Sequence, residues 1–178
     1  MLTKTRTLAV LALITVLVGC GRSGSTSTTM SSDTQPTIIP VQPDDAEMLA
    51  AMQTARARFP EFWREVSADY QRVIPALGGS MVKAYFCDEA APQCGEHMWV
   101  SEVEYDGETI TGVLADTPQE LRSVRSGERV SFPLERLSDW FYVDEGKAVG
   151  AFTVKLLRTR MTTEQRREHD SYYPFRFE

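Results

Sequence analysis

The 178-residue chain carries 19 basic and 25 acidic side chains, a net charge of −6, and 42% hydrophobic residues. This length is sufficient for one domain that buries a sizeable hydrophobic core. The acidic charge argues against a nucleic-acid partner and against electrostatic binding to anionic lipid, because both present negatively charged phosphates.

The amino-terminal segment has the features of an export signal. Lys4 and Arg6 precede an apolar run from Leu8 to Val18 that only Thr15 interrupts. As a helix this run would span about 16 Å, whereas the hydrocarbon core of a bilayer is about 30 Å thick. The run is therefore too short to cross a membrane and is typical of a signal peptide.

The export signal ends in Leu17-Val18-Gly19-Cys20, which resembles the bacterial lipobox. The resemblance implies acylation of the Cys20 thiol, cleavage that removes residues 1–19, and acylation of the new amino group. More than one acyl chain is needed for a stable anchor. If the host is Gram-negative, the resemblance also implies that the protein is anchored in the outer membrane and faces the periplasm, because residue 21 is Gly and not Asp. The alternative is an ordinary secretory signal whose Cys20 pairs with another cysteine.

A flexible linker is expected to follow the lipidated cysteine. Residues 21–43 contain ten Ser or Thr and three Pro, a composition that cannot bury enough apolar surface to fold. As a coil, the linker would reach roughly 25–30 Å. We therefore expect a signal peptide over residues 1–19, a lipidated linker over 20–43 and one folded domain over 44–178.

Two short helices, or one kinked helix, are expected at the start of the domain, over residues 44–58 and 60–68. Asp44 and Glu47 have the spacing of a capping box, and Pro60 interrupts the helical pattern. Apolar residues then recur every three or four positions, which predicts one buried helical face. These residues are Met48, Met52, Ala55, Phe59, Phe62 and Val66.

The pattern changes to the alternation of β-strands after residue 79. Six strands are expected, over residues 81–86, 97–105, 109–115, 127–132, 140–143 and 148–157. Asp106-Gly107 favours a type I′ hairpin turn, and the alternation places Trp99, Val103 and Tyr105 on one face of the second strand.

A short C-terminal helix is expected from Thr162, which has Gln165 at the capping-box spacing, to about His169. The order of elements predicts an α+β fold: N-terminal helices packed on a strongly curled antiparallel sheet of about six strands, with a short C-terminal helix. The aromatic tail over residues 172–177 is expected to pack back on this sheet, with an exposed binding segment as the alternative.

The domain resembles the YegJ-like family of bacterial proteins, which is defined by a domain of unknown function. The resemblance lies in the order and spacing of several short motifs over roughly residues 70–165. It implies a shared fold and no established activity. The motifs are Met81-Val-Lys-Ala-Tyr-Phe86, Glu96-His-Met-Trp-Val100, Ile110-Thr-Gly-Val-Leu114 with Pro118, Gly127-Glu-Arg-Val130, Ser138-Asp-Trp-Phe-Tyr-Val143 and Gly150-Ala-Phe-Thr153.

Cys87 and Cys94 enclose six residues between two expected strands. In an oxidising compartment such a pair forms a disulfide when its Cα atoms lie close together, so a structural disulfide is the favoured interpretation. The alternative adds His97 as a third metal ligand, but the sequence offers no evident fourth ligand. The sequence predicts no metal site and no cofactor.

A polar and aromatic group on the second strand is a candidate binding surface. His97 and Trp99 share a strand face, whereas Glu96 points to the opposite face and is therefore a poor acid–base partner for His97. The favoured interpretation places Trp99 in the core, with His97 hydrogen-bonded to the backbone. His97 is one of two histidines in the chain, with His169.

Ser138-Asp139-Trp140 suggests a hydrolase with His97 as its base, but the nucleophile-elbow motif Gly-x-Ser-x-Gly is absent from the sequence. Asp139 is therefore expected to fix a turn, and Trp140 to pack on the sheet. Lys83 is expected to face solvent, where it could also anchor an acidic ligand.

The sequence therefore favours a non-catalytic binding or interaction module, tethered to a membrane through Cys20 and with an envelope protein as a possible partner. Its candidate binding residues are Glu96, His97, Trp99, Asp139, Trp140 and Lys83. One alternative is an envelope hydrolase that uses Glu96, His97 and Asp139, and another is a purely structural envelope protein.

Overall fold

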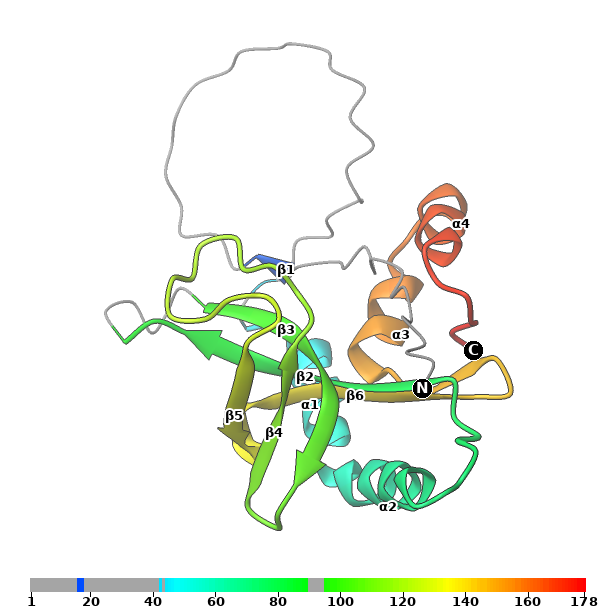
Figure 1. Cartoon of the computed structure of the whole chain (residues 1–178). Coiled ribbons are helices and arrows are strands. Elements are labelled where there is room, and N and C mark those ends of the chain that lie inside the picture. The colour runs from blue at the N-terminus through cyan, green and yellow to red at the C-terminus, as the bar shows by residue number, and fades with distance from the viewer. Residues whose placement is uncertain (1–15, 18–41, 43, 90–94) are drawn as a thin grey trace.

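The computed structural model describes residues 16–17, 42, 44–89 and 95–178 (Figure 1). Cys20, Cys94 and the expected linker lie outside these residues, apart from position 42. Within the described part of the chain, no helix combines the length and apolar character needed to cross a bilayer.

The two N-terminal helices form as expected, α1 over Ala46–Ala57 and α2 over Phe59–Tyr70. The side chain of Asp45, and not that of Asp44, caps α1, because its carboxylate accepts the Met48 N–H at 3.0 Å. The helices separate at Arg58, and Pro60 lies in the first turn of α2, where a missing N–H costs nothing. Except for the half-buried Met52, the predicted apolar face is buried.

The sheet is antiparallel throughout and has the strand order β5-β4-β3-β2-β6-β7. Its strands are β2 (Gly79–Cys87), β3 (Gly95–Tyr105), β4 (Thr109–Leu114), β5 (Arg129–Pro133), β6 (Leu137–Asp144) and β7 (Lys147–Gly150). A 3₁₀ turn, η1 (Leu134–Arg136), joins β5 to β6, and β1 (Val16–Leu17) pairs with β3 at Glu96 and His97. This confirms the α+β fold, although the sheet stays open and is less strongly curled than expected (Figure 1).

A bulge in β3 contradicts the predicted alternation of Trp99, Val103 and Tyr105. The pairing of β3 with β4 shifts between Ser101 and Glu104, and Glu102 adopts a left-handed conformation with φ of 52°. The extra residue reverses the side-chain alternation. Trp99 therefore packs on one face of the sheet, and Val103 and Tyr105 pack on the other.

The hairpin between β3 and β4 also differs from the type I′ turn that we expected. Such a turn needs a positive φ at both central residues, and within 106–108 only Gly107 has one, at 108°. Instead, the Asp106 carboxylate accepts the N–H groups of Glu108 and Thr109. The turn is therefore held by the aspartate side chain.

The expected sixth strand over residues 148–157 is wrong beyond Gly150. Gly150 and Ala151 both have positive φ, at 85° and 55°, and this reverses the chain from β7 into helix α3 (Phe152–Thr159). A Cβ at position 150 would overlap the Trp140 ring, so this turn requires glycine. The last helix, α4 (Thr163–Ser171), begins at the predicted capping box of Thr162 and Gln165.

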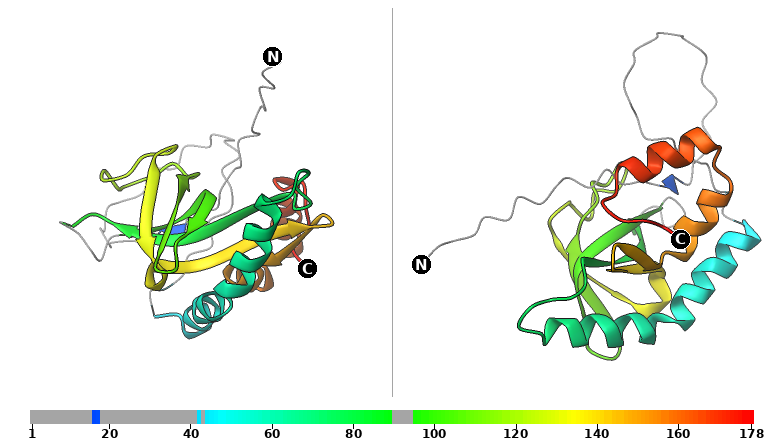
Figure 2. Two further views of the ribbon diagram at one scale, coloured as in Figure 1. Left: turned by 60° about the horizontal axis from the view of Figure 1, so that its bottom comes forward. Right: turned by 90° about the vertical axis from the view of Figure 1, so that its right-hand side faces the viewer.

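Helices cover both faces of the sheet (Figures 1 and 2). The first face packs against α1 and α2, and its core includes Val82, Val100 and Trp140. The second face, with Lys83, Trp99 and Phe141, is covered by α3, α4 and the C-terminal tail, residues 172–178. The tail packs back as expected, because Phe175 lies against Phe141 at a ring distance of 5.4 Å.

A buried polar pocket on the second face

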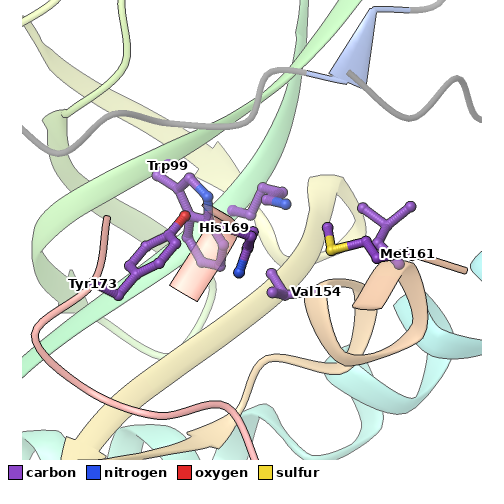
Figure 3. Close-up of a pocket in the computed structure, with 7 residues that line it drawn as sticks. Trp99, Val154, Met161, His169 and Tyr173 are labelled. Atoms are coloured by element: carbon purple, nitrogen blue, oxygen red, sulfur yellow. The ribbon is translucent and has the colours of Figure 1, made fainter. Parts of the chain in front are cut away.

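A small pocket lies between the second face of the sheet and the C-terminal elements, with an empty volume of about 290 Å³ that includes open solvent. In Figure 3, the rings of Trp99 and Tyr173 lie on one side of the pocket, Met161 lies on the other, and His169 is between them. The remaining lining residues are Lys83 from β2 and Val154 and Leu157 from α3.

Lys83 is buried in the wall of this pocket, with only 4% of its surface exposed. Its Nζ atom lies 4.5 Å from the centre of the Trp99 ring, a cation–π contact. Within the described part of the chain, its ammonium group makes no hydrogen bond or ion pair. Burial lowers the pKa of Lys83, while the charges of Asp139 and Asp116 oppose that shift.

The burial of Lys83 corrects the expectation that it faces solvent. Alternation along a strand shows which residues share a face but not whether that face is covered. Here α3, α4 and the tail cover the second face, and the Lys83 side chain is enclosed with Trp99 and His169.

Asp139, the register partner of Lys83 on β6, is fully buried and uses both carboxylate oxygens. One oxygen accepts the N–H groups of Trp140 and Phe152, at 2.8 and 2.9 Å. The other accepts the N–H and the hydroxyl of Thr153. Although burial raises its pKa, Asp139 caps the first turn of α3 and thereby positions Val154 and Leu157.

Asp116 is a third buried charged group near the pocket. Its Oδ2 atom accepts the Trp99 N–H at 2.9 Å, whereas its Oδ1 atom has no partner among the described residues. Burial raises the pKa of Asp116 to about 7, against the opposing effects of the Trp99 N–H and Lys83. This carboxyl group therefore titrates near neutral pH.

His169 and Tyr173 supply the remaining polar atoms of the lining. His169 is 4% exposed, and its Nε2 atom has no hydrogen-bond partner among the described residues. Burial, with the positive charges of Arg158 and Lys83, lowers the pKa of His169 to about 4, so the ring is neutral at pH 7. Burial raises the pKa of Tyr173 to about 12, so its hydroxyl keeps its proton.

The other candidate residues lie outside the pocket. Glu96 points to the opposite face, where its carboxylate accepts the N–H groups of Gln119, Glu120 and Leu121. His97 is half-buried against Tyr85, and its Nδ1 atom has no partner in the described structure. Trp140 packs in the core of the first face.

The chain matches a family model described as "Uncharacterized protein conserved in bacteria (DUF2314)" over residues 45–177. The chain belongs to the DUF2314 family. This confirms the resemblance to YegJ-like proteins, since the DUF2314 chain is 29% identical to "Uncharacterized protein YegJ" of Escherichia coli K12 over 70 residues, 39% of this chain and 46% of that protein.

A second relative of the DUF2314 chain is a Neisseria meningitidis serogroup B protein whose name makes it a candidate ankyrin repeat protein. It is 39% identical over 138 residues, 77% of this chain and 54% of that protein. The chain thus spans about half the length of the curated relatives it matches. No solved structure gives a significant match.

Sequence reasoning missed several pocket residues of this DUF2314 domain. Val154 and Leu157 fall in the expected sixth strand, and Asp116 directly follows the expected strand over residues 109–115. His169 and Tyr173 come from the last helix and the tail. The sequence offers one signal for these residues, the aromatic tail over residues 172–177. When such a tail packs back on the sheet, it also brings the preceding helix, which carries His169, close to the sheet.

Proposed function

We propose that this DUF2314 protein is a membrane-tethered envelope lipoprotein whose domain binds a ligand in the Lys83 pocket without converting it. The observation that carries the proposal is a pocket that encloses Lys83, which is 4% exposed, and His169 Nε2, which is buried without a partner in the described structure. Leaving a buried polar group unpaired costs free energy, so such groups need an explanation. A ligand that accepts hydrogen bonds from Lys83 supplies one.

The arrangement of the candidate catalytic residues favours binding over hydrolysis. The carboxylates of Glu96 and Asp139 are both occupied by backbone N–H groups. Glu96 and His97 lie on opposite faces of β3, and the Ser138 hydroxyl donates to the backbone carbonyl of Lys83. A nucleophile needs a base within hydrogen-bond reach, and these residues do not form such a pair.

The envelope location is part of the same proposal and rests on the lipobox-like sequence ending at Cys20. In an oxidising envelope, Cys87 and Cys94 would form the expected disulfide. Cys87 is half-buried with a free thiol at the end of β2, and Cys94 lies outside the described residues.

Substitution of the lipidated residue tests the anchor. We expect Cys20→Ser to leave the protein with its leader uncut or to release it as a soluble protein, because no thiol remains to be acylated. Cys87→Ser is the matched control and should stay acylated in the membrane fraction. Membrane fractionation with intact mass measurement checks this, and a Cys20→Ser protein that stays in the membrane at its mature size contradicts the anchor.

Recovery of the bound ligand tests the pocket. Full-length protein is purified from host membranes in a non-ionic detergent and denatured, and the released small molecules are identified by mass spectrometry. We expect one compound in the wild type that Lys83→Met depletes by about tenfold or more, as loss of a charged hydrogen bond predicts.

Lys155→Met is the matched control for that experiment, because Lys155 is a half-buried lysine on α3 that does not line the pocket. It should retain the compound. Identical small-molecule profiles for the wild type and Lys83→Met would contradict binding in the pocket and favour a purely structural envelope protein.

A further inference from the structure

The connection between α2 and β2, residues 71–78, exposes two adjacent apolar side chains. Val73 is 100% exposed and Ile74 is 82% exposed, so neither packs on the described part of the domain. Figure 1 shows this connection running around the outside of the molecule from the end of α2 to the start of β2. Single exposed apolar residues are normal on a protein surface, whereas an adjacent pair without packing partners needs a reason.

The loop that carries this pair is held in place at its base. The carboxylate of Asp69, which is 7% exposed, accepts the N–H groups of Ala76 and Leu77, at 2.7 and 3.4 Å. Leu77 packs against the first core, and the Gly78 N–H donates to the Val143 carbonyl at 2.8 Å. The apolar pair therefore projects from a fixed base, in a loop whose backbone groups are tied to the domain.

The residues beside the pair have the chemistry of a membrane interface. Tyr70, at the end of α2, is 49% exposed, and tyrosine is enriched at the headgroup level of membranes. The side chain of Arg72 is 58% exposed, and its length lets the charge stay at the headgroups while its neighbours enter the acyl region. Residues 70–80 contain no Asp or Glu, so no carboxylate has to leave water when Val73 and Ile74 insert.

The proposed anchor brings a bilayer within reach of this loop. Residues 21–43 would span about 75–80 Å when fully extended, whereas a domain of this length has a radius of gyration of roughly 14 Å. Any face of the domain can therefore turn toward the membrane. Because tethering raises the effective concentration of a second contact to the millimolar range, even a weak apolar contact decides which face does so.

We infer that the α2–β2 loop inserts Val73 and Ile74 into the bilayer that holds the lipid anchor, an inference that rests on the anchor in the proposed function. The acyl chains on Cys20 retain the protein, and the loop orients the domain, with Tyr70 and Arg72 at the headgroups. Burial of the two apolar side chains drives the contact. It therefore needs neither anionic lipid nor low salt, in keeping with the acidic charge of the chain.

Fluorescence quenching by brominated lipid tests this contact. The mature lipoprotein with Val73→Trp is reconstituted into phosphatidylcholine vesicles, with or without bromine atoms on the upper part of the acyl chains. The emission of the wild type, which comes from the native tryptophans, is subtracted. We expect the added tryptophan to lose most of its emission in the brominated vesicles, at low and at high salt.

Ser126→Trp is the matched control, because Ser126 is exposed in the connection between β4 and β5. In Figure 1 that connection lies across the molecule from the α2–β2 loop, so its added tryptophan should keep its emission in the same vesicles. Equal quenching at the two positions, no quenching with Val73→Trp, or quenching that disappears at high salt would overturn the inference.

A polar version of the loop separates insertion from proximity to the membrane. Tyr70→Trp places a reporter at the base of the loop, and its emission should be quenched. Adding Val73→Ser and Ile74→Ser should restore most of that emission, and these changes should leave the fold intact because both side chains are exposed. Unchanged quenching in the triple variant would show that the pair does not insert, and would also overturn the inference.

The anchor and the loop fail separately. Flotation with the vesicles reports the anchor, and if the wild-type protein does not float with them, the anchor and this inference are both wrong. If it floats but Val73→Trp is not quenched, the anchor stands, the loop inference is wrong, and the exposed pair favours a protein partner. Ligand binding in the Lys83 pocket is untouched by either result.

Discussion

The two faces of the sheet are both buried but are built differently. The first face packs aliphatic and aromatic side chains against α1 and α2, and its largest member, Trp140, has its indole N–H satisfied by the Ala55 carbonyl at 2.7 Å. The second face also has an aromatic cluster, but it encloses Lys83, Asp139 and His169. Among the described residues, no buried side-chain polar atom on the first face lacks a hydrogen-bond partner, whereas His169 Nε2 on the second face has none.

This difference separates stability from function within one small domain. Burying unpaired polar groups weakens a fold, and the first face shows that this sequence can build a core without them. Perturbed ionisable groups gathered at a pocket are typical of functional sites. The second face is therefore the place to look for binding, and the first face is the place where substitutions should affect only folding.

The largest expected effect on stability comes from replacing one of the two buried tryptophans, Trp140 or Trp99. Trp140→Ala should lower the free energy of unfolding by about 3–5 kcal/mol, as large-to-small substitutions in a packed core do. Trp99→Ala should cost less, because its ring borders a pocket and has fewer packing partners to lose. Urea denaturation followed by circular dichroism measures both, and an equal or larger cost for Trp99→Ala would break the comparison.

The next effect concerns the carboxylate that joins the second face to α3. Asp139→Ala removes the acceptor of three backbone N–H groups and the Thr153 hydroxyl, so the free energy of unfolding should fall by about 2–4 kcal/mol.

Asp144→Ala is the control for Asp139→Ala, because Asp144 is exposed at the end of the same strand. It should change the free energy of unfolding by less than about 0.5 kcal/mol. Similar losses in the two variants, measured by the same urea titration, would show that Asp139 does not hold α3 in place.

The sequence predicts the features that depend on neighbouring residues. The break at Pro60, the capping box at Thr162 and the order of the first five strands are all local patterns. The helix α3 was missed because Gly150 and Ala151 turn the chain in left-handed conformations. That turn is held by Asp139, an acceptor more than ten residues earlier in the chain.

The pocket could be predicted only in part, for the same physical reason. The sequence identifies Lys83 and Trp99 as candidates, but the burial of Lys83 depends on elements some seventy to ninety residues later, and alternation along β2 carries no information about them. The bulge at Glu102 moved Trp99 to the opposite face from Val103. A one-residue insertion of this kind leaves no clear mark in the sequence pattern.

The smallest of the expected stability effects is the pH dependence that Asp116 adds to the second face. Burial raises its pKa from 3.8 to about 7, so between these values the folded state binds more protons than the unfolded state. Stability from this group is therefore lost as pH rises from about 4 to above 7. His97 and His169 act in the opposite direction between about pH 4 and 6.5, because burial lowers both pKa values to about 4.

Asp116→Asn isolates this contribution, because its amide cannot lose a proton but can still accept the Trp99 N–H. The histidine contributions are the same in both proteins and cancel in the difference. We expect the variant to match the wild type near pH 4.5 and to be more stable by roughly 1–3 kcal/mol at pH 8. Urea titrations at both pH values measure the difference in the free energy of unfolding between the variant and the wild type. If this difference does not grow with pH, Asp116 ionises as an exposed carboxylate does.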